Sequence, residues 1–157
     1  MEKYLFMLRD SLVKKEKILI DLIAKSEEQA EIVKTEEVDW DEFNRIVEEK
    51  GALIEEIMKL DDGFELVFGR IKEGLEENKE KYKDTILEIK SLVKSVTEKS
   101  ATLQSTEQRN KTAIENAFSA ARREIKQSKL SQKAAVDYYN KMNRINTIDP
   151  QLMDKNC

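Results

Sequence analysis

The side chains that most often perform catalysis are scarce in this chain or stand without partners. The sequence contains no histidine, one cysteine (Cys157) and four glycines that do not cluster into a phosphate-binding loop. Hydrolytic triads, di-iron bundles and most zinc sites depend on imidazole, so these classes of active site are excluded. The neighbouring carboxylates Asp61 and Asp62 have no third ligand or base nearby in the sequence, and we interpret them as part of a solvated helix face. We therefore expect neither an enzyme nor a metal or other cofactor.

A second group of notable side chains lies near the C-terminus, where residues 134–146 read AAVDYYNKMNRIN. Together with the residues just before them, they place Leu130, Ala134, Tyr138 and Met142 four residues apart, which is the spacing of one face of a helix. Methionine and tyrosine adapt to grooves of different shapes, so this pattern is typical of a helix that binds another protein. The alternative is a segment that folds back onto its own bundle or frays.

Long helices are expected to carry these side chains. Charged residues make up 38% of the chain, and glycine and proline together occupy only five positions, a composition that favours extended helices. Apolar seams with alternating steps of three and four predict helices over residues 2–34, 40–76 and 79–128. No run approaches the roughly 18 apolar residues that span a bilayer, no signal-peptide core is visible, and one cysteine cannot form an internal disulfide. We expect a cytosolic protein.

Local signals mark two boundaries between these helices. Asp39 is a good N-cap, with Glu42 three residues later, and Trp40 on the first turn is interpreted as a lid over the end of the core. Over residues 74–82 the apolar seam shifts by one position, which indicates either a helical hairpin with Asn78 as a cap or a stutter in one long helix. We favour the hairpin.

The predicted fold is all-α, an elongated antiparallel three-helix bundle with a protruding C-terminal helical arm. The third helix would be roughly 75 Å long and the other two about 50–55 Å, so its end should project beyond them. We assign residues 1–112 to the helical bundle core, 113–146 to an amphipathic basic arm and 147–157 to an irregular tail. Residues 1–108 carry 18 basic and 27 acidic side chains, a net charge of −9, whereas residues 109–144 carry nine and three, a net charge of +6.

The arm is predicted to bind a helix of a partner protein through an exposed apolar strip, and its basic side chains favour an acidic partner. The predicted binding residues are Ile114, Phe118, Ala121, Arg122, Ile125, Leu130, Tyr138 and Met142. Nucleic acid is not expected as a partner, because the chain is acidic overall and lacks the known binding motifs. Membrane insertion is not expected either, because the apolar face of the arm is mostly alanine and buries little area.

Three parts of the chain carry a family resemblance: the Leu-rich first helix, residues 39–65 (DWDEFNRIVEEKGALIEEIMKLDDGFE) and residues 121–156 (ARREIKQSKLSQKAAVDYYNKMNRINTIDPQLMDKN). With them the sequence resembles the FlgN-type flagellar export chaperones, in the form found in clostridia-like bacteria. The resemblance implies a cytosolic protein that binds the C-terminal helices of hook-filament junction proteins, prevents their premature assembly and delivers them to the flagellar type III export gate. It also implies that a tyrosine docks at the export gate, and Tyr138 and Tyr139 are the matching positions.

A structural coiled-coil protein that self-associates through its C-terminal arm is the alternative function. Three polar residues at seam positions of the third helix, Ser100, Glu107 and Asn110, fit this reading, because buried polar residues can fix the register between two chains. A chaperone is expected to be a monomer or a weak dimer, whereas this alternative requires an obligate dimer.

Overall fold

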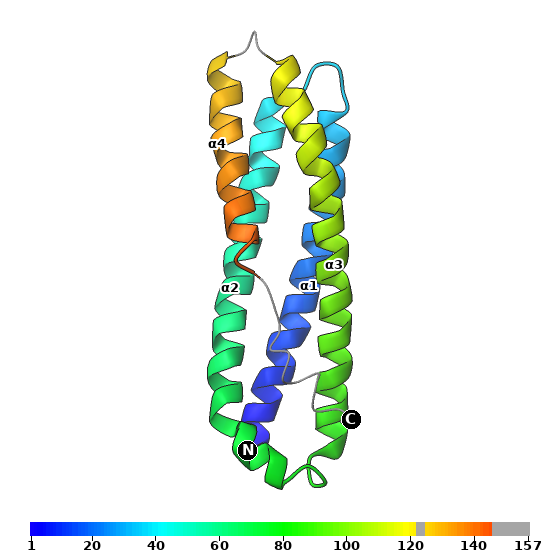
Figure 1. Cartoon of the computed structure of the whole chain (residues 1–157), viewed down its shortest axis with the longest axis vertical. Helices are drawn as coiled ribbons and strands as arrows, with labels where there is room; N and C mark the ends of the chain where they lie inside the picture. Colours follow the sequence, from blue (N-terminus) through cyan, green and yellow to red (C-terminus); the bar gives the residue numbers. More distant parts are fainter. Residues whose placement is uncertain (122–124, 146–157) are drawn as a thin grey trace.

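The computed structural model describes residues 1–121 and 125–145, with side chains for 1–121 and 130–145. These residues form four helices: α1 (Glu2–Val33), α2 (Trp40–Glu77), α3 (Lys83–Ala120) and α4 (Ile125–Met142). The helices run alternately up and down along one long axis (Figure 1). The expected all-α bundle is therefore confirmed. In the part of the chain that is described, none of the helices has the length and apolar character needed to cross a membrane.

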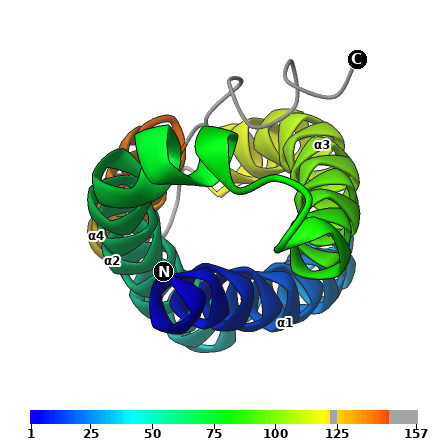
Figure 2. The same cartoon turned by 90° about the horizontal axis from the view of Figure 1, so that it is seen from below.

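Helix α1 is the common neighbour of the two long helices, since it packs along both α2 and α3. Helix α4 packs along α2 and shares a cleft with α3. In the upper half of the molecule, the four helices therefore surround one core in the order α1, α2, α4, α3 (Figures 1 and 2). In this order α1 and α3 run in the same direction, as do α2 and α4.

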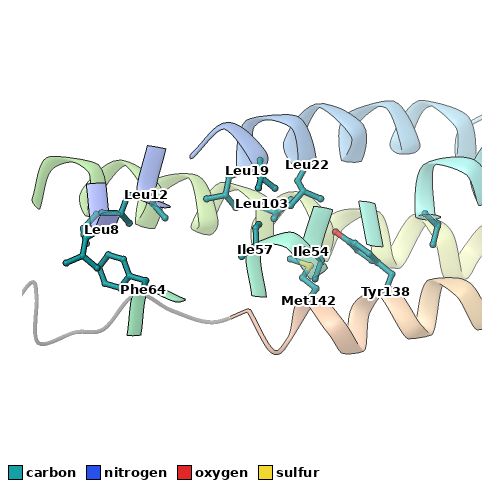
Figure 3. Close-up of a cluster of buried hydrophobic side chains, with 14 of the residues drawn as sticks. Leu8, Leu12, Leu19, Leu22, Ile54, Ile57, Phe64, Leu103, Tyr138 and Met142 are labelled. Atoms are coloured by element: carbon teal, nitrogen blue, oxygen red, sulfur yellow. The ribbon is translucent and has the colours of Figure 1, made fainter. Parts of the chain in front are cut away.

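The core is built from the apolar seams that the helical periodicity predicted. In α1, five seam leucines are at most 2% exposed: Leu5, Leu8, Leu12, Leu19 and Leu22. Figure 3 shows several of these leucines facing side chains of α2 and α3, among them Ile57 and Leu103. Burial of aliphatic side chains of this size contributes roughly 1.5–3 kcal/mol each, which makes these seams the main source of stability.

The start of α2 follows the predicted capping pattern. The Asp39 carboxylate accepts a hydrogen bond from the backbone N–H of Glu42 at 3.1 Å, which satisfies one of the free donors of the first turn. Trp40 is 3% exposed, and its ring stacks on Phe118 of α3 with 5.0 Å between the ring centroids. The expectation that Trp40 covers the end of the core is confirmed.

The connection between α2 and α3 is a tight turn, so the hairpin interpretation is confirmed. Helix α2 is unbroken through the Asp-Asp-Gly sequence at 61–63 and ends at Glu77. The Asn78 side chain then caps it by donating from Nδ2 to the Gly74 carbonyl oxygen at 2.7 Å. Tyr82 precedes the first residue of α3, and the chain has reversed its direction by that point.

The C-terminal region differs from the expected protruding arm. Helix α3 ends at Ala120, so it has the same number of residues as α2, 38, and does not project as a 50-residue helix would. The chain then reverses, and α4 runs back along α2. Ile114, which was predicted to belong to the exposed apolar strip of the arm, is only 2% exposed. The physical reason is that α1, α2 and α3 leave one side of the core open at this end, and the apolar face of α4 gains by leaving water to close it.

Candidate functional site

The inner face of α4 is packed on the chain's own bundle rather than presented to solvent. Ala135, Tyr138 and Met142 are 5%, 3% and 8% exposed. Figure 3 shows Tyr138 and Met142 pointing from α4 into the core, with Ile54 of α2 beside Met142. Tyr138 and Met142 were predicted to bind a helix of a partner protein, and in this conformation they pack against α2 of the same chain.

Four polar side chains, one from each helix, lie close together where α4 packs on the bundle. We call Gln29 of α1, Lys50 of α2, Glu107 of α3 and Tyr138 of α4 the polar layer. The Lys50 ammonium donates to Gln29 Oε1 at 2.7 Å and to Glu107 Oε1 at 2.8 Å. It also lies 4.3 Å from the centroid of the Tyr138 ring. Lys50 therefore links all four helices through a single charged group.

The electrostatics of the polar layer follow from its burial. Lys50 is 0% and Glu107 2% exposed, so they form an ion pair that is removed from water. Burial lowers the pKa of Lys50, and the charge of Glu107 and its hydrogen bond oppose that effect. Burial raises the pKa of Tyr138 and Tyr139 well above that of a free phenol, and the negative charge of Glu107 raises both further. Both phenols are therefore neutral at neutral pH.

Several polar atoms beneath α4 have no hydrogen-bond partner among the described residues. They are Glu107 Oε2 and the hydroxyl groups of Ser131 and Tyr139. A buried polar group without a partner costs about 1–3 kcal/mol. A cleft of about 300 Å³ between α3 and α4, lined by Glu107, Tyr139 and Met142 among others, is large enough to admit water to part of this region. Helix α4 is thus held by apolar contacts with α2, while its polar contacts are incomplete.

An ion pair at the edge adds little to this contact. Lys141 Nζ lies 2.5 Å from Glu55 Oε1 of α2, but the two side chains are 40% and 56% exposed. Exposed pairs of this kind contribute at most about 1 kcal/mol, because water already solvates both charges.

The remaining predicted binding residues do not form one continuous strip. Phe118 is half-buried against Trp40 and Ala121 is half-buried, whereas Leu130 is 64% exposed on the outer side of α4. The side chains of Arg122 and Ile125 lie outside the described residues, as does the tail at 147–157. Some residues of the predicted strip are therefore packed in the core, whereas Leu130 is exposed to solvent.

Two of the three polar seam residues of α3, Glu107 and Asn110, have partners within the chain. Glu107 binds Lys50, and Asn110 Nδ2 donates to the Ser26 carbonyl oxygen at 2.7 Å. Sequence reasoning assigned these residues only to a possible contact between chains. The positions of Lys50 and Glu107 in the apolar seams indicated that each needs a buried partner, but Lys15 also occupies a seam position, so the sequence did not identify the pair.

The paired carboxylates at 61 and 62 separate into two environments, which corrects the interpretation that both are solvated. Asp61 accepts a hydrogen bond from Lys15 Nζ at 2.6 Å, and Lys15 is only 4% exposed. Burial raises the pKa of Asp61, and the charge of Lys15 opposes the rise. Asp62 is exposed. The Asp61–Lys15 pair joins α1 to α2 and belongs to the packing of the bundle.

No protein-family model, no curated protein and no solved structure matches this chain. The surface between α4 and the rest of the bundle, with its polar layer, is the feature from which its function can be argued.

Proposed function

We propose that this chain is a cytosolic chaperone of flagellar type III export, of the FlgN type. It binds the C-terminal helices of hook-filament junction proteins, prevents their premature assembly and delivers them to the export gate. The sequence of residues 39–65 and 121–156 supports the family. The observation that carries the proposal is the incompletely paired contact between α4 and the bundle, because it makes α4 the helix that a substrate can replace.

The substrate helix would take the position of α4 along α2. Helix α4 buries the hydroxyl groups of Tyr139 and Ser131 without hydrogen-bond partners among the described residues. A substrate helix with aliphatic residues at the corresponding positions would bury the same apolar surface of α2 without leaving those groups unpaired. Ordering the substrate and displacing α4 both oppose binding, so we expect a Kd between about 10 nM and 10 μM.

Displacement of α4 would also change the surface that the export gate meets. Tyr138 is buried and Tyr139 half-buried while α4 is packed. A substrate in the place of α4 would leave both rings in solvent on a basic helix. In this mechanism the tyrosines are available for docking at the export gate only after a substrate has bound, so empty chaperones do not compete for the gate.

The test is calorimetric titration of the full chain with peptides that span the C-terminal helices of hook-filament junction proteins from the same genome. The decisive variant carries Glu55→Cys and Lys141→Cys, with Cys157→Ser, and joins α4 to α2 through a short bismaleimide linker. We expect the linked protein to bind at least about tenfold more weakly than the same protein before linking.

A matched control carries Lys25→Cys and Glu49→Cys with the same Cys157→Ser change. These residues form an ion pair between α1 and α2 with 2.9 Å between Lys25 Nζ and Glu49 Oε2, so their linkage leaves α4 free and should not change binding. If the unlinked full chain binds none of the peptides at tens of micromolar, the chaperone function is wrong. If linkage of α4 leaves the affinity unchanged, the exchange of α4 is wrong.

No observation favours the alternative of a coiled-coil protein that dimerises through its arm. Tyr138 and Met142, which would form that interface, are buried in the chain's own core. Light scattering on the purified protein would support the alternative if it found only dimers at all concentrations.

A further inference from the structure

Among the described residues, α4 fills the fourth position of the bundle along only half of its length. Helix α4 has 18 residues and α2 and α3 have 38 each, which correspond to about 27 Å and 57 Å. The contact between Lys141 and Glu55 places the end of α4 beside the middle of α2. From there to the turn after α2, the described residues provide only α1, α2 and α3 (Figure 1).

An apolar groove lies between α2 and α3 in this lower half, and we call it the α2–α3 groove. Its apolar lining consists of Phe68, Leu75, Ile86 and Leu87. Phe68 is 5% exposed, whereas Leu87 is 54% exposed. The groove has a volume of about 180 Å³. A closed apolar cavity of about 150 Å³ accepts benzene, so this groove has room for one or two apolar side chains of a partner.

The rim of the groove is basic, although the bundle around it is acidic. Four lysines line it together with two acids: Lys72, Lys79, Lys83, Lys90, Glu76 and Glu80. Within the described part of the chain, Lys72, Lys79 and Lys83 form no ion pair. Residues 1–108 as a whole carry a net charge of −9. Basic side chains around an apolar floor select an acidic partner, both by attraction and by repulsion of basic competitors.

We propose that the α2–α3 groove docks an amphipathic helix of a partner protein whose apolar stripe is flanked by acidic side chains. About 20 residues of helix span the 30 Å that α4 leaves uncovered. An aliphatic side chain of this helix enters between Phe68 and Leu87, and its carboxylates face Lys72 and Lys83. The groove lies at the opposite end of the bundle from Tyr138, so this interaction is independent of the substrate site proposed above.

The experiment uses two synthetic peptides of about 20 residues that share one leucine stripe. In one peptide the flanking positions are glutamate, and in the other they are lysine. Fluorescence anisotropy measures the binding of each labelled peptide to the full chain at about 50 mM and about 300 mM salt. We expect the acidic peptide to bind at least about tenfold more tightly than the basic one at low salt, and the difference to shrink at high salt.

Two variants assign the binding to the groove. Leu87→Ser removes an exposed apolar contact and Lys83→Glu reverses a charge of the rim, and each should weaken binding of the acidic peptide by about fivefold or more. The matched controls are Leu66→Ser and Lys17→Glu, which make the same changes at exposed positions outside the groove. They should leave the affinity unchanged. Circular dichroism should show the same thermal midpoint for Leu87→Ser and Leu66→Ser, because both side chains are largely exposed.

Four results would overturn the proposal. The first is equal binding of the two peptides or no binding of the acidic one at about 100 μM. The second is an equal effect of Leu87→Ser and Leu66→Ser. The third is self-association that Leu87→Ser abolishes, which would identify a second copy of the chain as the occupant. The fourth is cross-linking of the Cys157 thiol to a groove lysine that blocks peptide binding, which would identify the chain's own last residues.

Discussion

Lys50→Met is expected to lower the free energy of unfolding by about 3–5 kcal/mol. The substitution leaves the Glu107 carboxylate 2% exposed and without the cation that now lies 2.8 Å from it. The Gln29 amide oxygen loses its donor as well. Removing one partner of a buried pair is costly mainly because the remaining charge stays out of water with nothing to compensate it.

The double variant Lys50→Met/Glu107→Leu distinguishes two quantities. One is the destabilisation caused by a buried charge without a partner, and the other is the net contribution of the ion pair to the free energy of unfolding. Both charges are then gone, and apolar replacement of a buried pair is often neutral or stabilising by about 1–4 kcal/mol. We expect the double variant to recover most of the stability that Lys50→Met loses, with a coupling energy of more than about 3 kcal/mol between the two sites, because each single change leaves one charge buried without its partner. Arg45→Met is the control, because Arg45 pairs with Glu49 in solvent, and its denaturation midpoint should stay that of the unchanged protein.

Urea denaturation provides the assay, followed by circular dichroism and by the fluorescence of Trp40. Trp40 is the only tryptophan and is buried at the end of the core, so it reports on the part of the bundle that contains α4. Coincident transitions by both probes would justify a two-state analysis. A loss of less than about 1 kcal/mol in Lys50→Met would refute the reasoning, because it would mean that water reaches the Lys50–Glu107 pair in solution.

Three further predictions concern pH, helix propensity and capping. The raised pKa of Tyr138 means that above about pH 10 the folded chain keeps a proton that the unfolded chain has lost, so stability is fully present below that pH and falls above it. Tyr138→Phe should reduce the fall by up to about 1.4 kcal/mol per pH unit in urea denaturation near pH 11, and an unchanged slope would show that the hydroxyl is solvated. Gly63→Ala should raise the free energy of unfolding by roughly 0.5–1 kcal/mol, because a Cβ there meets open space; a lowered thermal midpoint would contradict this. Asp39→Ala should lower the free energy of unfolding by about 1 kcal/mol in urea denaturation, because the N-cap hydrogen bond is lost. Asp39→Asn keeps an acceptor and should change the free energy of unfolding little.

The helices and their ends could be derived from the sequence because they depend on short-range interactions. The N-cap at Asp39 and the cap at Asn78 involve residues three to four positions away in the chain, and both were located correctly. The alternating apolar seam also showed which face of each helix is buried. An unbroken seam across 61–63 was sufficient to predict that α2 continues through its Asp-Asp-Gly sequence, because one glycine costs a helix only about 1 kcal/mol.

The position of α4 could not be derived in this way. Apolar residues at helical spacing satisfy the core of the same chain and the groove of a partner equally well, and the choice depends on whether α1, α2 and α3 leave room for a fourth helix. Likewise, Lys50 and Glu107 are 57 positions apart in the chain, so their polar seam positions show only that each needs a partner. Tertiary packing decides that the two meet each other, because it alone brings α2, α3 and α4 to the same level of the bundle.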